Sequence, residues 1–138
     1  MNIEINIRQL VNRLEDAASS ERMDALQELL SLAKSDPKVV GVLCLQRVLD
    51  LLREQGSPEE YEESLDLIYR LVKCRDKTIS NSNTKLILVD QKNVELLLDL
   101  LEHESMTVGV MASQILTEIH CNDGSLLEKQ IQDCPAGM

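Results

Sequence analysis

The chain has 138 residues, of which 43% are hydrophobic and 28% charged, and its formal net charge is −10. This length suffices for one domain with a single core. The acidic balance argues against a surface that holds nucleic-acid phosphates, and it disfavours direct docking on anionic lipids. Phe and Trp are absent and Tyr occurs twice. We therefore expect an all-α core of aliphatic side chains, because sheets depend more on aromatic and β-branched residues.

The cysteines and the apolar stretches predict a cytoplasmic protein. None of the four cysteines belongs to a C-x-x-C pair, and Cys44 and Cys74 lie in apolar runs with a helical period. This pattern is typical of reduced, buried thiols. The start of the chain lacks the features of a signal peptide. The densest apolar stretch, 96–101, is short and contains Asp99, so we expect no membrane insertion.

The first half of the chain predicts four helices. Apolar residues with a helical period run from Ile3 to Leu14 and again from Ala25 to Ala33. The pair Asp36-Pro37 is typical of a helix start, and the third helix continues to about residue 54, before Gly56. The motif Ser57-Pro58-Glu59-Glu60 predicts the cap and first turn of the fourth helix, which buries apolar residues up to 72.

The second half is less regular. Residues 75–84 are polar, and 80–83 read Ser-Asn-Ser-Asn, so we predict a loop at about 75–90 inserted between repeats. Helices are expected from about Gln91 to Glu102 and from about Thr107 to His120. The sequence Asn-Asp-Gly at 122–124 predicts a break. After it, Ser125 and Glu128 have the spacing of a capping box, which predicts a last short helix that stops before residue 135.

Two patterns repeat at long spacing. A pattern of small and apolar residues begins at Ala25. It recurs at Ser64, 39 residues later, and at Ala112, 48 residues further on. Leu-Asp-Leu-Leu at 49–52 returns at 98–101. A period near 40 is typical of armadillo and HEAT repeats, whose units bury their apolar faces by stacking. We predict an armadillo/HEAT-like right-handed superhelix with residues 1–138 in a single domain. A four-helix bundle is the alternative.

The residues that could carry chemistry form no convincing catalytic or metal site. His120, Cys121 and Cys134 could be drawn as zinc ligands, but adjacent residues on a helix are poor chelators. The same adjacency makes His120 a poor base for a Cys121 nucleophile, because the two side chains diverge. The five glycines form no phosphate-binding motif. We expect no enzyme activity, no cofactor and no metal.

A protein-binding surface is the better candidate. In stacked repeats, the last helix of each unit lines a concave face where extended partners lie. The two helices with the Leu-Asp-Leu-Leu pattern carry polar residues at steps of three and four, which places each set on one face. The predicted binding residues are Gln46, Asp50, Arg53, Glu95, Asp99 and Glu102. They predict a mostly acidic groove with Arg53 as the exception; the alternative is that they are ordinary exposed positions.

Several stretches carry a resemblance to a known family. The closest is 91–102, which reads Gln-Lys-Asn-Val-Glu-Leu-Leu-Leu-Asp-Leu-Leu-Glu. The helix from Ala25 to Lys34, the residues Leu65, Asp66 and Tyr69, and the segment 135–138 are also similar. On these residues, most of the chain from about residue 7 resembles the N-terminal head of the general vesicular transport factor family, whose members tether vesicles at the Golgi.

The resemblance implies an armadillo-like head that is followed, in a longer protein, by a coiled coil and an acidic tail. It implies a role in endoplasmic reticulum to Golgi transport, with Rab GTPases and SNARE proteins as partners, homodimerisation and peripheral attachment to Golgi or vesicle membranes. The chain lacks the acid-rich insertion of animal members at 75–90. We read it as an N-terminal fragment of a longer head. The alternative function is an armadillo-type adaptor or chaperone cofactor of another cytosolic pathway.

Overall fold

The computed structural model describes residues 3–15, 18–54 and 57–133, apart from the side chain of Ser19. Within these ranges every regular element is an α-helix, which confirms the all-α prediction. The helices are α1 (Ile3–Arg13), α2 (Ser19–Ser35), α3 (Pro37–Arg53), α4 (Pro58–Val72), α5 (Lys77–Leu88), α6 (Gln91–Leu100) and α7 (Met106–Asp133). These seven helices do not form the four-helix bundle that was the alternative.

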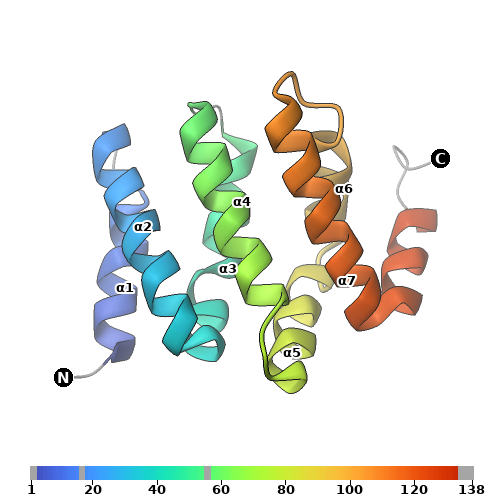
Figure 1. The fold of residues 1–138 in the computed structure, drawn as a ribbon, viewed down its shortest axis with the longest axis horizontal. Helices are drawn as coiled ribbons and strands as arrows, with labels where there is room; N and C mark the ends of the chain where they lie inside the picture. The colour runs from blue at the N-terminus through green and yellow to red at the C-terminus, as the bar shows by residue number, and fades with distance from the viewer. Residues whose placement is uncertain (1–2, 16–17, 55–56, 134–138) are drawn as a thin grey trace.

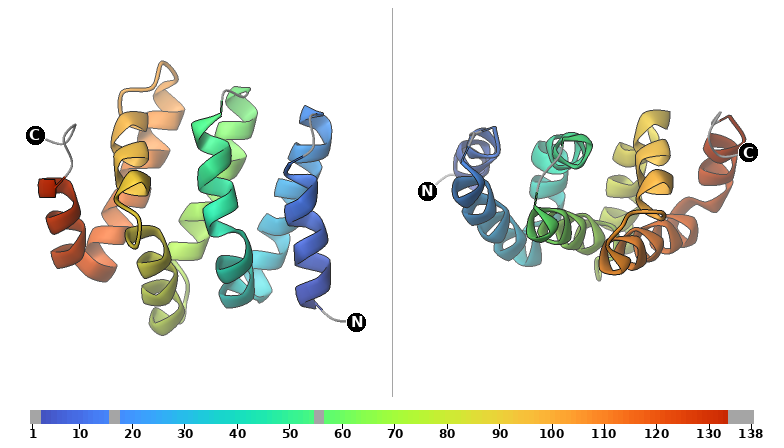
Figure 2. Two further views of the ribbon diagram at one scale, coloured as in Figure 1. Left: turned by 180° about the vertical axis from the view of Figure 1, so that it is seen from behind. Right: turned by 90° about the horizontal axis from the view of Figure 1, so that it is seen from above.

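The helices are arranged in two layers (Figures 1 and 2). One layer contains α2, α4 and the first part of α7, and α4 packs against both of the others. The second layer contains α1, α3, α5, α6 and the last part of α7. Helix α3 packs on α1, α4 and α5, and it also touches α6. The core lies between the layers, and among the described helices none contacts a helix more than three elements away along the chain.

The three segments with the period near 40 lie in the same layer. Ala25, Ser64 and Ala112 begin these segments on α2, α4 and α7, and all three are buried. Helix α4 lies between α2 and α7, so the equivalent segments are neighbours in space. A small residue at this position lets adjacent helices approach closely, and the larger apolar residues that follow fill the core on either side.

The 49-residue repeat agrees with the burial pattern only in the turn that precedes the Leu-Asp-Leu-Leu motif. Leu45 and Val48 on α3 are buried, and so are Val94 and Leu97, 49 residues later on α6. The agreement ends at the motif itself, because Leu49 is buried on α3 whereas its equivalent Leu98 is only partly buried, and α6 stops at Leu100. The next side chain, Leu101, is 41% exposed, although its equivalent on α3 is buried.

The predicted loop at about 75–90 is wrong, because residues 77–88 form helix α5. The buried positions of this helix are Ser80, Asn83, Thr84, Ile87 and Leu88. Their spacing is that of a helix face, but three of the five residues are polar, so a search for apolar periodicity misses it. Asp76 caps the helix by accepting a hydrogen bond from the Thr78 N–H at 2.9 Å.

The polar residues on the buried face of α5 all have hydrogen-bond partners. The Ser80 hydroxyl accepts from the Cys74 N–H at 2.8 Å, and the Asn83 amide donates to the Leu71 carbonyl at 2.8 Å. The Thr84 hydroxyl accepts from Asn122 at 2.8 Å. Because these groups are satisfied inside the protein, the low helix propensity of Ser and Asn does not prevent the helix.

Two predicted helix starts have different outcomes. The Ser57 hydroxyl accepts from the Glu60 N–H at 3.3 Å, which confirms the predicted cap of α4. The predicted cap at Ser125 is wrong, because Asp123 performs that role by accepting from the Leu126 N–H at 3.3 Å. Asp123 has a non-helical backbone with φ −156° and ψ 73°, which confirms the predicted break at 122–124. The predicted helix end at Gly56 lies outside the described residues.

Candidate protein-binding surface

The structure brings the three predicted binding residues of α3 together around Asn93 on α6. The Gln46 amide donates to Asp50 at 3.0 Å, and Arg53 donates to the Asp50 carboxylate at 2.7 Å and to the Asn93 carbonyl oxygen at 3.0 Å. The Asn93 amide donates to the Gln46 side chain at 3.0 Å and to the Ile87 backbone carbonyl at 3.0 Å. Gln46, Asp50 and Arg53 therefore join α3 to α6.

Asn93 is the residue of this network that the sequence analysis missed. It is completely buried although its side chain is polar. Its position is equivalent, 49 residues on, to that of buried Cys44 on α3. That equivalence was the available signal, because it places a polar amide where the repeat has an apolar residue. A buried amide needs hydrogen-bond partners, and the ends of α3 and α5 provide them.

The three predicted residues of the second trio have a different environment. Glu95 is half-buried, whereas Asp99 and Glu102 are exposed, and these carboxylates follow one another along α6 and the turn after it. No hydrogen bond or ion pair of the described residues joins their side chains to the Asn93 network. The carboxylate of Asp50, by contrast, is already paired with Arg53. We call Glu95, Asp99 and Glu102 the acidic row.

Exposed apolar side chains lie beside the end of the acidic row. Leu101 is 41% exposed, and at the start of α7 Met106 is 83% and Val110 51% exposed. Together with His103, Glu104, Ser105, Gly109, Ser113 and Gln114 they line an open hollow of about 530 Å³. We call Leu101, Met106 and Val110 the apolar patch. Sequence periodicity gave no sign of it, since each of these residues fits the core of a helix equally well.

The turn between α6 and α7 is held against the start of α4. The rings of His103 and Tyr61 lie 4.9 Å apart at a tilt of 55°. The Nδ1 atom of His103 accepts a hydrogen bond from the Ser105 N–H at 3.0 Å. This contact positions the turn that carries Glu102 and the apolar patch.

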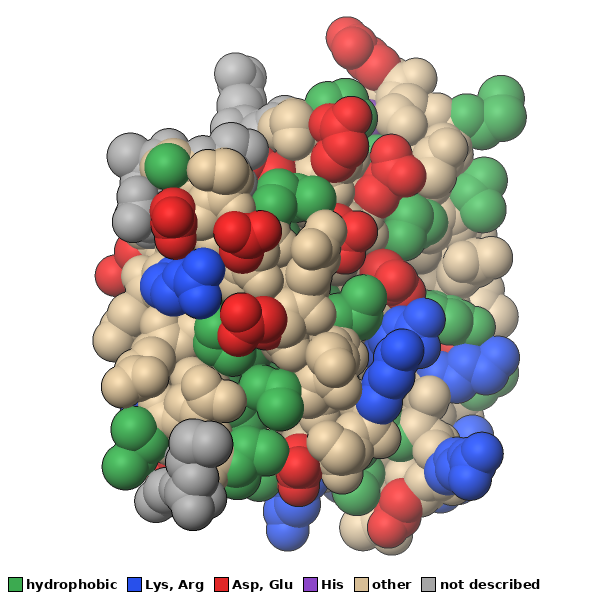
Figure 3. All heavy atoms as spheres, turned by 60° about the vertical axis from the view of Figure 1, so that its left-hand side comes forward, with side chains coloured by type: hydrophobic (Ala, Val, Ile, Leu, Met, Phe, Trp, Pro, Cys, Tyr) green, Lys and Arg blue, Asp and Glu red, His purple; other side chains and the backbone are tan. Residues whose placement is uncertain are grey.

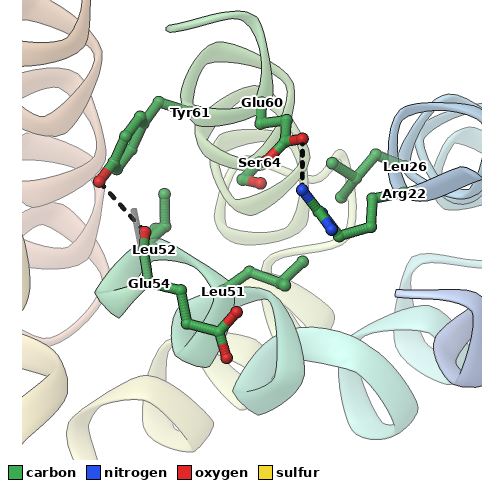
Figure 4. A pocket seen from close by; sticks show the side chains of 8 residues that line it. All are labelled: Arg22, Leu26, Leu51, Leu52, Glu54, Glu60, Tyr61 and Ser64. Atoms are coloured by element: carbon green, nitrogen blue, oxygen red, sulfur yellow. Dashed lines mark hydrogen bonds and ion pairs between the residues drawn. The ribbon is translucent and has the colours of Figure 1, made fainter. Parts of the chain in front are cut away.

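A small cavity lies where α2, α3 and α4 meet (Figure 4). Arg22 on α2 is paired with Glu60 on α4 at 2.9 Å, and both side chains are mostly buried. The Tyr61 hydroxyl donates to the Glu54 carbonyl at 3.2 Å. The accessible volume is about 10 Å³, which is room for one water and not for a substrate. The interactions in this cavity join three helices.

The histidine and cysteine side chains form no cluster in the described ranges. Among these residues no group of three or more His, Cys, Asp or Glu side chains could hold a metal ion. His120 lies 3.3 Å from Glu128, Cys121 is exposed, and Cys134 lies outside the described residues. Cys44 is buried, and this burial raises the pKa of its thiol to about 12. It is therefore a core residue and a poor nucleophile at neutral pH.

The described helices include none that is both long enough and apolar enough to span a membrane. No protein-family model matches the sequence, and a search of curated proteins finds no match.

Proposed function

We propose that the chain is a non-catalytic protein-binding scaffold and that its helices form part of an armadillo/HEAT-like superhelix in a vesicle-tethering factor. The repeated segments of α2, α4 and α7, which lie side by side in one layer, support the repeat architecture. The resemblance of residues 91–102 and other stretches to the general vesicular transport factor family supports a role in transport between the endoplasmic reticulum and the Golgi.

The observation that carries the binding function is the acidic row next to the apolar patch. Carboxylates that have no cationic partner among the described residues, beside exposed Leu and Met side chains, favour a partner segment that is basic and partly apolar. Rab GTPases and SNARE proteins are the partner classes that the family resemblance suggests. On this proposal the acidic row accelerates association, and the apolar patch slows dissociation once water has been excluded.

The proposal is tested with a charge-reversal pair, Asp99→Lys and Glu102→Lys. Binding to a GTP-loaded Rab GTPase of the endoplasmic reticulum to Golgi step is measured by biolayer interferometry, with the GDP-loaded form as a reference. We expect the affinity to fall by about tenfold or more, because two attractive charge contacts become repulsive.

The matched control is Asp24→Lys with Asp133→Lys. Both residues are exposed and lie on α2 and at the end of α7, and the change in net charge is the same. The control is expected to bind like the unmodified protein. An equal loss in the two variants would show a general effect of charge, and no loss in either would remove the acidic row from the interface.

The second candidate function is an armadillo-type adaptor or chaperone cofactor of another pathway, which the helical layers suit equally well. Fractionation of cells that express the full-length protein separates the two. A tether is expected to be recovered with Golgi membranes and to be released by high salt without detergent. Recovery in the supernatant alone would favour the adaptor.

A further inference from the structure

A second charged surface lies at the ends of α2 and α4. In Figure 1 both helices end in the lower half of the molecule, whereas the turn between α6 and α7 lies at the upper edge. An open groove of about 490 Å³ separates these two helix ends. It is lined by Ala33, Lys34, Pro37, Arg70, Lys73, Cys74, Arg75 and Asp76. Four cations and one carboxylate give this basic groove a local excess of three positive charges in a chain of net charge −10.

The cations of the basic groove are largely available to a ligand. Lys34 and Arg75 are exposed, and no hydrogen bond or ion pair joins either side chain to another described residue. Arg70 is paired with Asp66 at 3.3 Å, on an exposed part of the same helix. Lys73 is more engaged, because it donates to the Tyr69 hydroxyl at 3.1 Å and lies 3.8 Å from a carboxylate oxygen of Glu118, whose side chain is mostly buried. The exposed Arg70–Asp66 pair is weak, so a ligand can compete for Arg70.

Neutralising the end of α4 does not explain this concentration of positive charge. Cations are often found at helix C-termini because the last carbonyls lack partners. Here side chains of α5 and α7 already donate to two of these carbonyls, and a third side chain donates to the carbonyl of Cys74, which follows the helix. The pairs are Asn83 with Leu71 at 2.8 Å, Asn122 with Val72 at 2.8 Å, and Ser80 with Cys74 at 3.2 Å. The cations are therefore not needed as caps.

We propose that the basic groove binds an acidic peptide segment of a partner protein. Pro37, which is partly exposed, supplies an apolar surface between the cations, on which a small apolar side chain of the peptide packs. Carboxylates on either side of it reach Lys34 on one wall and Arg75 on the other. The groove is large enough for a few side chains. A groove lined by charged side chains is typical of sites that recognise short peptide motifs.

The surroundings of the groove favour a peptide over a membrane or a nucleic acid. Figure 3 shows Lys and Arg side chains toward the right and lower right of this face, with Asp and Glu side chains among them and more of these over the upper part. A flat anionic bilayer or a long polyanion would bring its charge close to these carboxylates as well. A short segment confined to the groove avoids that repulsion. This proposal does not rest on the acidic row, which lies at the opposite edge.

The test uses a fluorescent peptide of about ten residues in which Asp and Glu flank a central Leu-Val pair, and binding is followed by fluorescence anisotropy. A peptide with Asn and Gln in place of the acids is the ligand control. The protein variant is Lys34→Glu with Arg75→Glu, and the matched variant is Lys85→Glu with Lys129→Glu. Lys85 and Lys129 are exposed, lie outside the groove, and change the net charge by the same amount. Circular dichroism checks that each variant is folded.

We expect the groove variant to lose affinity for the acidic peptide by about tenfold or more, the matched variant by about twofold or less, and binding to weaken as salt is raised. The neutral pair Lys34→Gln with Arg75→Gln is expected to lose an intermediate amount, and it replaces the reversed pair if that pair is unfolded. No binding of the acidic peptide, equal binding of the amide peptide, or equal losses in the groove and matched variants would each overturn the proposal. So would groove-dependent binding to phosphatidylserine vesicles without binding to the peptide.

Discussion

At the scale of single residues, the protein uses side-chain amides to satisfy backbone carbonyls at the ends of helices. Asn83 and Asn122 donate to carbonyls at the end of α4. Asn93 donates to the Ile87 carbonyl, and Gln130 donates to the Leu88 carbonyl at 2.6 Å. Each bond crosses from one helix to another, so it both caps a helix and fixes the position of its neighbour. A buried carbonyl that lost such a donor would remain without a partner.

Replacing Asn93 with Ala should therefore be costly. Asn93→Ala removes the donor to Ile87 and breaks the contacts with Gln46 and Arg53. We expect the free energy of unfolding to fall by about 2 kcal/mol, the cost of leaving a buried polar group unsatisfied. Urea denaturation followed by circular dichroism measures it. The control is Asn81→Ala on the exposed side of α5, where a change within about 0.5 kcal/mol is expected.

A result in which both variants lose the same stability would contradict a special role for Asn93. It would instead point to a general effect of Asn replacement in helices. Because Ala has the higher helix propensity, the control is expected to lie on the stabilising side of zero.

At the scale of helices, capping separates positions that look alike in the sequence. Ser57 and Ser125 both begin a pattern with Glu three residues later, yet only Ser57 accepts a backbone N–H at the start of its helix. Two residues before Ser125, Asp123 leaves the helical conformation and accepts from Leu126. Asp and Ser are both good caps, so the sequence could not decide between the two starting positions.

The cap assignment gives a direct test by thermal denaturation. Asp123→Ala is expected to lower stability by about 1 kcal/mol, as is usual for the loss of a cap, and Ser57→Ala by a similar amount. Ser125→Ala should be neutral or slightly stabilising, because Ser125 lies inside the helix, where Ala is preferred. A loss of stability in Ser125→Ala that matched the loss in Asp123→Ala would show that the helix begins at Ser125.

The helices that sequence analysis located have apolar buried faces, and the one that it missed does not. Leu65, Ile68 and Leu71 made α4 predictable from their spacing. The buried face of α5 instead carries Ser80, Asn83 and Thr84. Their burial depends on hydrogen-bond partners from α4 and α7. Whether such a polar face is buried depends on contacts with residues that are distant in the sequence. A pattern within one segment therefore cannot reveal it.

The same limit applies to the candidate surfaces. The six predicted binding residues follow a repeat that is visible in the sequence. The arrangement of Arg53 toward α6, however, depends on Asn93, which is 40 residues away. The apolar patch depends on where α6 stops. The basic groove collects residues from the ends of two helices; Arg70, Lys73 and Arg75 lie in one basic stretch of the sequence, but the position of Lys34 opposite them depends on the fold.

At the scale of the whole molecule, the net charge of −10 makes the stability of the fold depend on salt concentration. Like charges repel one another more strongly in the compact state than in the unfolded chain, and salt screens this repulsion. We expect the melting temperature to rise by a few degrees between about 10 and 150 mM NaCl. The control is Asp24→Lys with Asp133→Lys, which should show a smaller rise. A fall in melting temperature with salt would mean that the ion pairs outweigh the repulsion.

The number of neighbours that each helix contacts determines where local unfolding of the molecule begins. Helix α1 packs only on α2 and α3, whereas α4 is held by α2, α3, α5 and α7. In such a stack, local unfolding proceeds from the edge inward, because an edge helix loses one set of neighbours and a central helix must lose several. Amide hydrogens of α1 should therefore exchange with deuterium first, and those of α4 should remain protected until the whole structure opens.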